Sequence, residues 1–227
     1  MLGQTFYHET LRKCVVGFGT LFNDIHIVRR DSSGNVQQSM KVPLAYGPKQ
    51  KFLVRLREDP SISKSVAITL PRIYFEMTGI DYDGARKTAA TQKYKATIDG
   101  NGNEVKTQYV PVPYNVQFEL GIIAKSQDDG LQILEQILPY FQPSFNLSID
   151  LVDVIGEKRD MPITLDNISM EDNYEGDFMT RRALIYTLNF TCKSYLFGPI
   201  NASSDGLIKK VQADFYTDTS NIRTPTR

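Results

Sequence analysis

Residues 115–139 read NVQFELGIIAKSQDDGLQILEQILP. In residues 115–124, apolar side chains recur at every second position: Val116, Phe118, Leu120, Ile122 and Ala124. Such alternation is typical of an antiparallel strand with one buried face. From Asp128 onward the spacing becomes helical, and Pro139 ends a helix whose apolar stripe is Leu131, Leu134 and Leu138. The stretch therefore predicts a half-buried strand that leads into an amphipathic helix.

Acidic residues stand at the predicted start of this helix. Ser126 and Asp129 form a start that resembles a capping box, and Asp128 and Asp129 occupy the first turn. Carboxylates in a first turn offset the positive end of the helix dipole and stabilise the helix by about 0.3–1 kcal/mol each. This pair of acids therefore needs no catalytic explanation.

The chain before this stretch predicts a helix, a β-hairpin and a second helix. The first helix follows from a cap and apolar residues at helical spacing: Thr5, then Leu11, Cys14, Val15, Phe18 and Phe22. Strands at 25–30 and 36–46 flank turn residues and make the hairpin. Gly47-Pro48 then ends the second strand and starts a short helix, which we expect to end near Asp59-Pro60.

The remaining elements are mostly strands, predicted at residues 73–78, 147–154, 161–168 and 183–196. Helices and strands do not alternate regularly along the chain. This order favours an α+β fold, in which helices pack on a largely antiparallel sheet. We expect one domain over residues 1–216 and a flexible C-terminal tail over residues 217–227.

Two further segments are expected to serve contacts with other molecules. Residues 86–109 are polar and contain the hairpin-turn signal Asp99-Gly100-Asn101-Gly102, so they predict a projecting β-hairpin. Residues 207–216 include Leu207, Val211, Ala213 and Phe215. This segment is too apolar for a free tail, and we expect it to dock as an added strand or arm.

The composition excludes several classes of function. Lys plus Arg equals Asp plus Glu at 26 each, so no overall charge draws the chain to nucleic acid or an anionic membrane. Residues 1–6 lack a basic region followed by an apolar stretch, and no run approaches the ~20 apolar residues that span a bilayer. We therefore expect a soluble protein made in the cytoplasm, without membrane association.

The sequence contains no signature of a common enzyme, cofactor or metal site. His8 and His26 lie on different elements without other ligands at metal-binding spacing. Gly17-Phe18-Gly19 lies inside a predicted helix, where helix packing explains it better than nucleotide binding. Asp99, Asn101 and Asn103 resemble the opening of a calcium loop, but Glu104 and Val110 occupy the positions that need glycine and the bidentate acid. We expect no catalytic, cofactor-binding or metal-binding residue, and buried free thiols at Cys14 and Cys192.

Residues 135–146, EQILPYFQPSFN, resemble the most recognisable segment of the tail sheath stabiliser and completion proteins of large lytic contractile-tailed phages. Other segments fall in the same order and spacing as in that family: Leu21-Phe22, Val42-Pro43, Leu70-Pro71-Arg72-Ile73, Arg181-Arg182, Gly206-Leu207-Ile208 and Asp214-Phe215. The resemblance runs from about Gly3 to Phe215. It departs at the C-terminus, where relatives can carry a longer polar, proline-rich extension.

The resemblance implies a structural virion protein with a fold similar to phage tail terminators. Members of that family form a hexameric ring at the head-proximal end of the tail, in contact with the tail terminator, the tail sheath and neck proteins of the head. Such a ring stabilises sheath and tube, assembles in the host cytoplasm, and lets DNA pass through its lumen without specific binding. The candidate interface residues are Lys95, Asp99, Asn101, Glu104, Lys106, Arg181, Arg182, Leu207, Lys209, Lys210 and Phe215.

Two alternatives stay open at this point. The polar hairpin and the basic pairs Arg181-Arg182 and Lys209-Lys210 could serve a nucleic-acid-binding accessory protein, although ordinary solvated surface residues are the simpler explanation of such pairs. An enzyme of unfamiliar type is the third reading. Salt-sensitive DNA binding would favour the nucleic-acid-binding protein, and a tightly bound metal or nucleotide would favour the enzyme.

Overall fold

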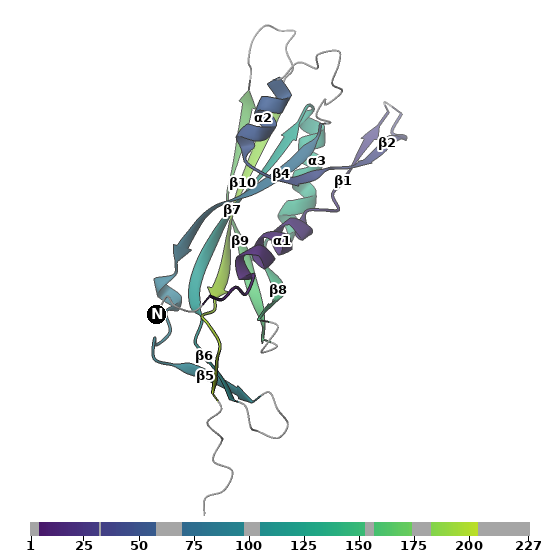
Figure 1. Ribbon diagram of the computed structural model, residues 1–227. Coiled ribbons are helices and arrows are strands. Elements are labelled where there is room, and N and C mark those ends of the chain that lie inside the picture. The colour runs from purple at the N-terminus through teal and green to yellow at the C-terminus, as the bar shows by residue number, and fades with distance from the viewer. Residues whose placement is uncertain are drawn as a thin grey trace, which may run out of the picture.

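A six-stranded sheet forms the centre of the molecule (Figure 1). The computed structural model describes residues 5–31, 33–57, 70–97, 105–152, 157–173 and 183–203. The sheet order is β3-β4-β7-β10-β9-β8, and every pair is antiparallel except β3–β4. The strands are β3 Leu44–Tyr46, β4 Arg72–Tyr82, β7 Val112–Ala124, β8 Ser144–Val152, β9 Glu157–Asn173 and β10 Ala183–Leu196. This architecture confirms the predicted α+β class.

Two helices cover one face of the sheet, and a third covers part of the other. Helices α1 (Thr10–Leu21) and α3 (Gln127–Ile137) lie on the same face, and a 3-10 turn, η2 (Leu138–Tyr140), follows α3 (Figure 1). Helix α2 (Lys49–Arg57) lies at the upper end of the opposite face, where Phe52 stacks on Tyr74. The described helices therefore cover both faces of the sheet at its upper end and one face elsewhere. No helix in the described ranges combines the length and apolarity that a membrane span requires.

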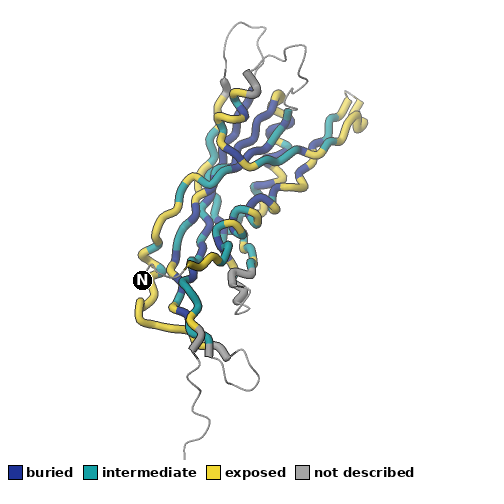
Figure 2. Tube along the Cα trace, viewed as in Figure 1, coloured by how far each residue is buried: buried dark blue, intermediate teal, exposed yellow. Residues whose placement is uncertain are grey.

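The core between the sheet and α1 is aromatic. Phe18 is fully buried, and its ring centroid lies 4.4 Å from that of Phe118 and 5.3 Å from that of Phe190. Figure 2 shows that the buried residues of β4, β7 and β10 are concentrated in the upper part of these strands. The apolar alternation of β7 and β10 thus specifies the face that receives α1.

Two predictions for this core are confirmed: Gly17 and Gly19 serve helix packing, and Cys14 and Cys192 are buried free thiols. A Cβ on Gly17 would lie 2.8 Å from Leu147 Cδ2, and one on Gly19 would lie 2.7 Å from Phe75 Cζ, so these glycines let α1 approach the sheet. Cys14 and Cys192 are free and buried. Burial raises the pKa of Cys192 to about 12 and also raises the pKa of Cys14, so both thiols stay protonated at neutral pH.

Two predicted boundaries near the N-terminus are wrong. Thr5 does not cap α1, which begins at Thr10. His8 Nε2 lies 2.9 Å from the Gly198 carbonyl oxygen, and this contact holds His8 against the segment that follows β10. Residues 36–46 are not one strand. The hairpin strand β2 (Val36–Lys41) pairs with β1 (His26–Arg30), whereas β3 crosses to the main sheet and pairs with β4.

The predicted details of α3 also need correction. Leu131 is 41% exposed, and the buried face is formed by Asp129, Gly130, Ile133, Leu134 and Ile137. The reason is Gly130: a Cβ there would lie 2.4 Å from the Tyr186 ring, so the helix turns this glycine toward the sheet. Ser126 occupies the N-cap position but makes no side-chain cap hydrogen bond, and Asp129 does not complete a capping box.

A three-stranded sheet lies at the lower end of the molecule (Figure 1). The hairpin predicted within residues 86–109 is observed as β5 (Lys93–Thr97) paired with β6 (Val105–Tyr109). A third strand that sequence reasoning missed, β11 (Asn201–Ser203), pairs with β6. The predicted turn at Asp99-Gly100-Asn101-Gly102 lies outside the described residues, as do the predicted end of α2 near Asp59-Pro60 and the predicted tail at 217–227.

Gly121 is a position where the fold requires the absence of a side chain. A Cβ there would lie 1.9 Å from Cζ of Tyr74, whose ring is fully buried against it. Gly121→Ala should lower the free energy of unfolding by about 1–3 kcal/mol, because the Tyr74 ring must move. Urea unfolding measures this. Gly198→Ala is the control, since no atom lies within 4 Å of its Cβ. Equal stabilities of the two variants would contradict the account.

Candidate interaction surface

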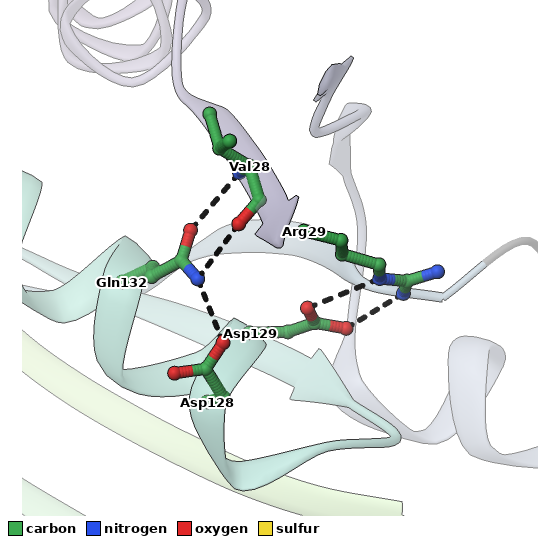
Figure 3. A network of polar contacts seen from close by, with 5 residues as sticks. All are labelled: Val28, Arg29, Asp128, Asp129 and Gln132. Carbon is green, nitrogen blue, oxygen red and sulfur yellow. Dashed lines mark hydrogen bonds and ion pairs between the residues drawn. The ribbon is translucent and has the colours of Figure 1, made fainter. Parts of the chain in front are cut away.

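The β1–β2 hairpin is held on α3 by two glutamine side chains. Gln132 Nε2 donates to the Val28 carbonyl (3.0 Å), and its Oε1 accepts the Val28 N–H (3.0 Å), as Figure 3 shows. One turn along, Gln136 makes the same pair of bonds with His26, at 2.7 Å and 3.4 Å. Two residues of strand rise about 6.6 Å and four residues of helix about 6 Å, so the spacings match. The glutamine amides therefore pair with the backbone edge of β1 as a neighbouring strand would.

Arg29 and Asp129 complete this attachment (Figure 3). Arg29 donates through two nitrogens to the two carboxylate oxygens, at 2.7 Å and 3.3 Å. The Asp129 side chain is only 3% exposed, whereas that of Arg29 is 40% exposed. The hydrogen bond to Asp129 raises the pKa of Arg29. The acid that the sequence assigns to the helix dipole thus also neutralises and fixes an arginine from the hairpin.

An apolar hollow lies where α1 and α3 end. Its volume is about 550 Å³, and its apolar lining includes Leu21, Phe22, Ile137, Phe141 and Phe145. Tyr140 lies at the rim, and as a residue it is 68% exposed. Most of this lining comes from residues 135–146, the segment that carries the family resemblance in the sequence. The residues of that segment therefore build both the core and an exposed apolar surface.

The part of the sheet that none of the described helices covers presents carboxylates. Pairing register places Glu76, Asp81 and Glu119 on this face, and the Asp166 carboxylate reaches it through a hydrogen bond from Thr191. We call this surface the open face. Arg72 lies at the upper end of this face, and Lys193 lies at the lower end, where Arg86 also contacts Asn115. Carboxylates near the middle of a polar surface disfavour phosphate binding there.

The predicted interface residues fall mainly outside the described ranges. Lys95 is exposed on β5 and Lys106 is half-buried on β6, so the structure brings these two together on one hairpin. The remaining candidates lie outside the described residues: Asp99, Asn101, Glu104, Arg181, Arg182, Leu207, Lys209, Lys210 and Phe215. Arg86, at the start of the predicted hairpin, instead contacts the main sheet, where it donates to Asp83, Asn115 and the Tyr114 carbonyl.

Sequence reasoning missed Gln132, Gln136 and Tyr140. The two glutamines stand four residues apart on a predicted helix, a spacing that places them on one face and gives a usable signal. Tyr140 follows Pro139 in the helix-ending segment, and nothing in the sequence separates it from a core aromatic. No group of three or more potential metal ligands occurs within the described part of the chain.

The Arg29–Asp129 pair should contribute measurably to stability. Arg29→Ala leaves a buried carboxylate without its partner, so the free energy of unfolding should fall by about 1–3 kcal/mol. Urea unfolding measures the change. Arg12→Ala is the matched control, because the Arg12 side chain is 68% exposed and its ion pair with Glu9 spans 3.6 Å. The control should change stability by less than about 0.5 kcal/mol. Similar losses of unfolding free energy in both variants would show that the buried Asp129 carboxylate does not depend on Arg29 for stability.

Comparison with known proteins agrees with the resemblance of residues 135–146. The family described as T4-like virus Myoviridae tail sheath stabiliser matches residues 5–227. A curated relative, "Tail completion protein gp15" of Enterobacteria phage T4, is 31% identical over 224 residues, which cover 96% of this chain and 80% of that protein. The chain therefore belongs to the T4-like Myoviridae tail sheath stabiliser family, and it is a structural protein of a phage tail.

Proposed function

We propose that this chain forms a hexameric ring at the head-proximal end of a contractile phage tail, where it stabilises the sheath and tube and connects the tail to the neck. The observation that carries the proposal is the family match over residues 5–227. The proposed neighbours are the tail terminator, the tail sheath protein and neck proteins of the head. The work of such a ring is binding and resistance to mechanical load, not catalysis.

The distribution of surfaces supports a closed ring. A cyclic oligomer other than a dimer needs two different surfaces on each subunit that fit each other. The molecule has the apolar hollow beside α1 and α3, and well away from it the three-stranded sheet at the lower end (Figure 1). A lasting contact of this kind buries about 1,600 Å² in total. Distinct surfaces on one elongated subunit are suited to this head-to-tail contact.

An open face turned toward the lumen of the ring would favour passage of DNA without specific binding. The carboxylates of Glu76, Asp81, Glu119 and Asp166 repel phosphates, and a basic surface would instead retain them. This arrangement also weighs against the nucleic-acid-binding alternative. In that alternative, an exposed sheet face is expected to carry lysine and arginine.

The ring can be tested with the purified full chain. Sedimentation should give a species of six times the 25.7 kDa chain mass, and negative-stain images should show rings. Some rings close only on their docking surface. The chain is therefore also added to tails assembled without it, where it should bind at the head-proximal end and prevent loss of the sheath. A chain that stays monomeric in solution and leaves these tails unchanged would exclude the proposed function.

A further inference from the structure

A groove runs along the last strand of the main sheet. Two hollows of about 550 and 560 Å³ adjoin at Leu21, which lines both. One contains Phe145, and the other contains Leu147 and Ile149, so alternate residues of β8 line the pair of hollows in succession. Val16 of α1 lines the second hollow and is 60% exposed as a residue. We call the two hollows together the α1–β8 groove.

The groove adjoins a sheet edge with free backbone groups. β8 pairs with β9 on one side and is the last strand of the sheet in the described ranges. An edge strand presents unpaired N–H and C=O groups that an extended segment can pair with. Phe145, Leu147 and Ile149 are each only half-buried. An added strand would therefore gain backbone hydrogen bonds and cover apolar side chains at once.

The chain itself contains a segment with the matching pattern. In residues 207–215, LIKKVQADF, every second position is Leu207, Lys209, Val211, Ala213 and Phe215. Four of these five are apolar, and the intervening residues are mostly polar, which is the pattern of a strand with one buried face. This segment follows β11, which ends at Ser203, and it lies outside the described residues.

Charge distinguishes the two possible directions of such a strand. Glu135 lines the hollow that contains Phe145, together with Asp24, which pairs with Lys41. Arg12 and Lys13 line the other hollow, together with Glu9, which pairs with Arg12. Lys209 is on the apolar side of the segment and complements the acidic hollow. The segment would then run parallel to β8, with Val211, Ala213 and Phe215 beside the aliphatic end of the groove.

The direction of β11 favours a groove on another copy. β6 leads through Val110 and Pro111 into β7 of the main sheet, and β11 runs antiparallel to β6. The strand β11 therefore runs away from the six-stranded sheet of its own chain. Return to its own β8 would require a reversal within the few residues between Ser203 and Leu207.

We propose that residues 207–215 of one subunit add a parallel strand to β8 of the next subunit and fill its α1–β8 groove. This inference rests on the proposed ring and names the contact that closes it. The contact is heterologous, because the segment and the groove are different surfaces, and repetition around six subunits closes the ring.

Cross-linking of introduced cysteines tests the contact. Full-length chain carrying Val16→Cys and Ala213→Cys is treated with a bismaleimide, to which each thiol adds without any oxidant. The native thiols are buried, with Cys14 and Cys192 each 1% exposed. A denaturing gel should show a ladder of linked chains, both in solution and on assembled tails. A link within one chain, or no link in either preparation, would overturn the proposal.

Two matched variants sharpen the test. Met170→Cys replaces Val16→Cys as the control, because Met170 is 64% exposed on β9 and lies outside the groove; it should give no ladder. Glu135→Lys should lower the ladder yield about fivefold, and Lys209→Glu added to it should restore the yield. An unchanged yield with Glu135→Lys would refute the assigned direction. Hexamers by sedimentation without cross-links would reject the added strand while leaving the proposed ring intact.

Discussion

The packing of Phe18 of α1 on the face of the main sheet is the contact on which the rest of the structure depends. Its ring stacks on Phe118 of β7 and lies within 5.6 Å, centroid to centroid, of Phe22, Phe75 and Phe190. Burying one such side chain stabilises a fold by about 1.5–3 kcal/mol. Gly17 and Gly19 allow this approach, since a Cβ on either would meet a side chain at less than 3 Å. The position of α1 in turn sets the groove between α1 and β8 and the hollow beside α3.

The sequence predicts an element well where burial of a single face determines the spacing of its apolar residues. Strands β7 and β10 alternate because one face is buried along their length, and α1 has an apolar stripe because it faces Phe118 and Phe190. A prediction is wrong where apolar spacing and close packing require different orientations of the same helix. Leu131 belongs to an apolar stripe by spacing, yet Gly130 against Tyr186 decides how α3 is turned.

The interaction surface is harder to predict for a physical reason. Tyr140 and Phe141 are adjacent aromatics, but one is 68% exposed and the other packs on Phe190 at 5.1 Å between centroids. The strand β11 is three residues long, and only its pairing with β6 identifies it. Asp129 is a first-turn acid in the sequence and a buried partner of Arg29 in the fold. Each of these roles depends on residues about a hundred positions away or on the tertiary fold, which local patterns do not contain.

This chain is a structural protein of a phage tail, and such a protein works through its surfaces. In this chain the groove, the open face and the three-stranded sheet are separate surfaces, and the aromatic core fixes α1 against the main sheet beside the groove. The account is tested most directly by a cryo-electron microscopy map of purified tails that contain this chain. It predicts sixfold density for the six-stranded sheet in a ring between the last sheath layer and the neck. Density for the chain at any other level of the tail, or its absence from the tail, would contradict the account.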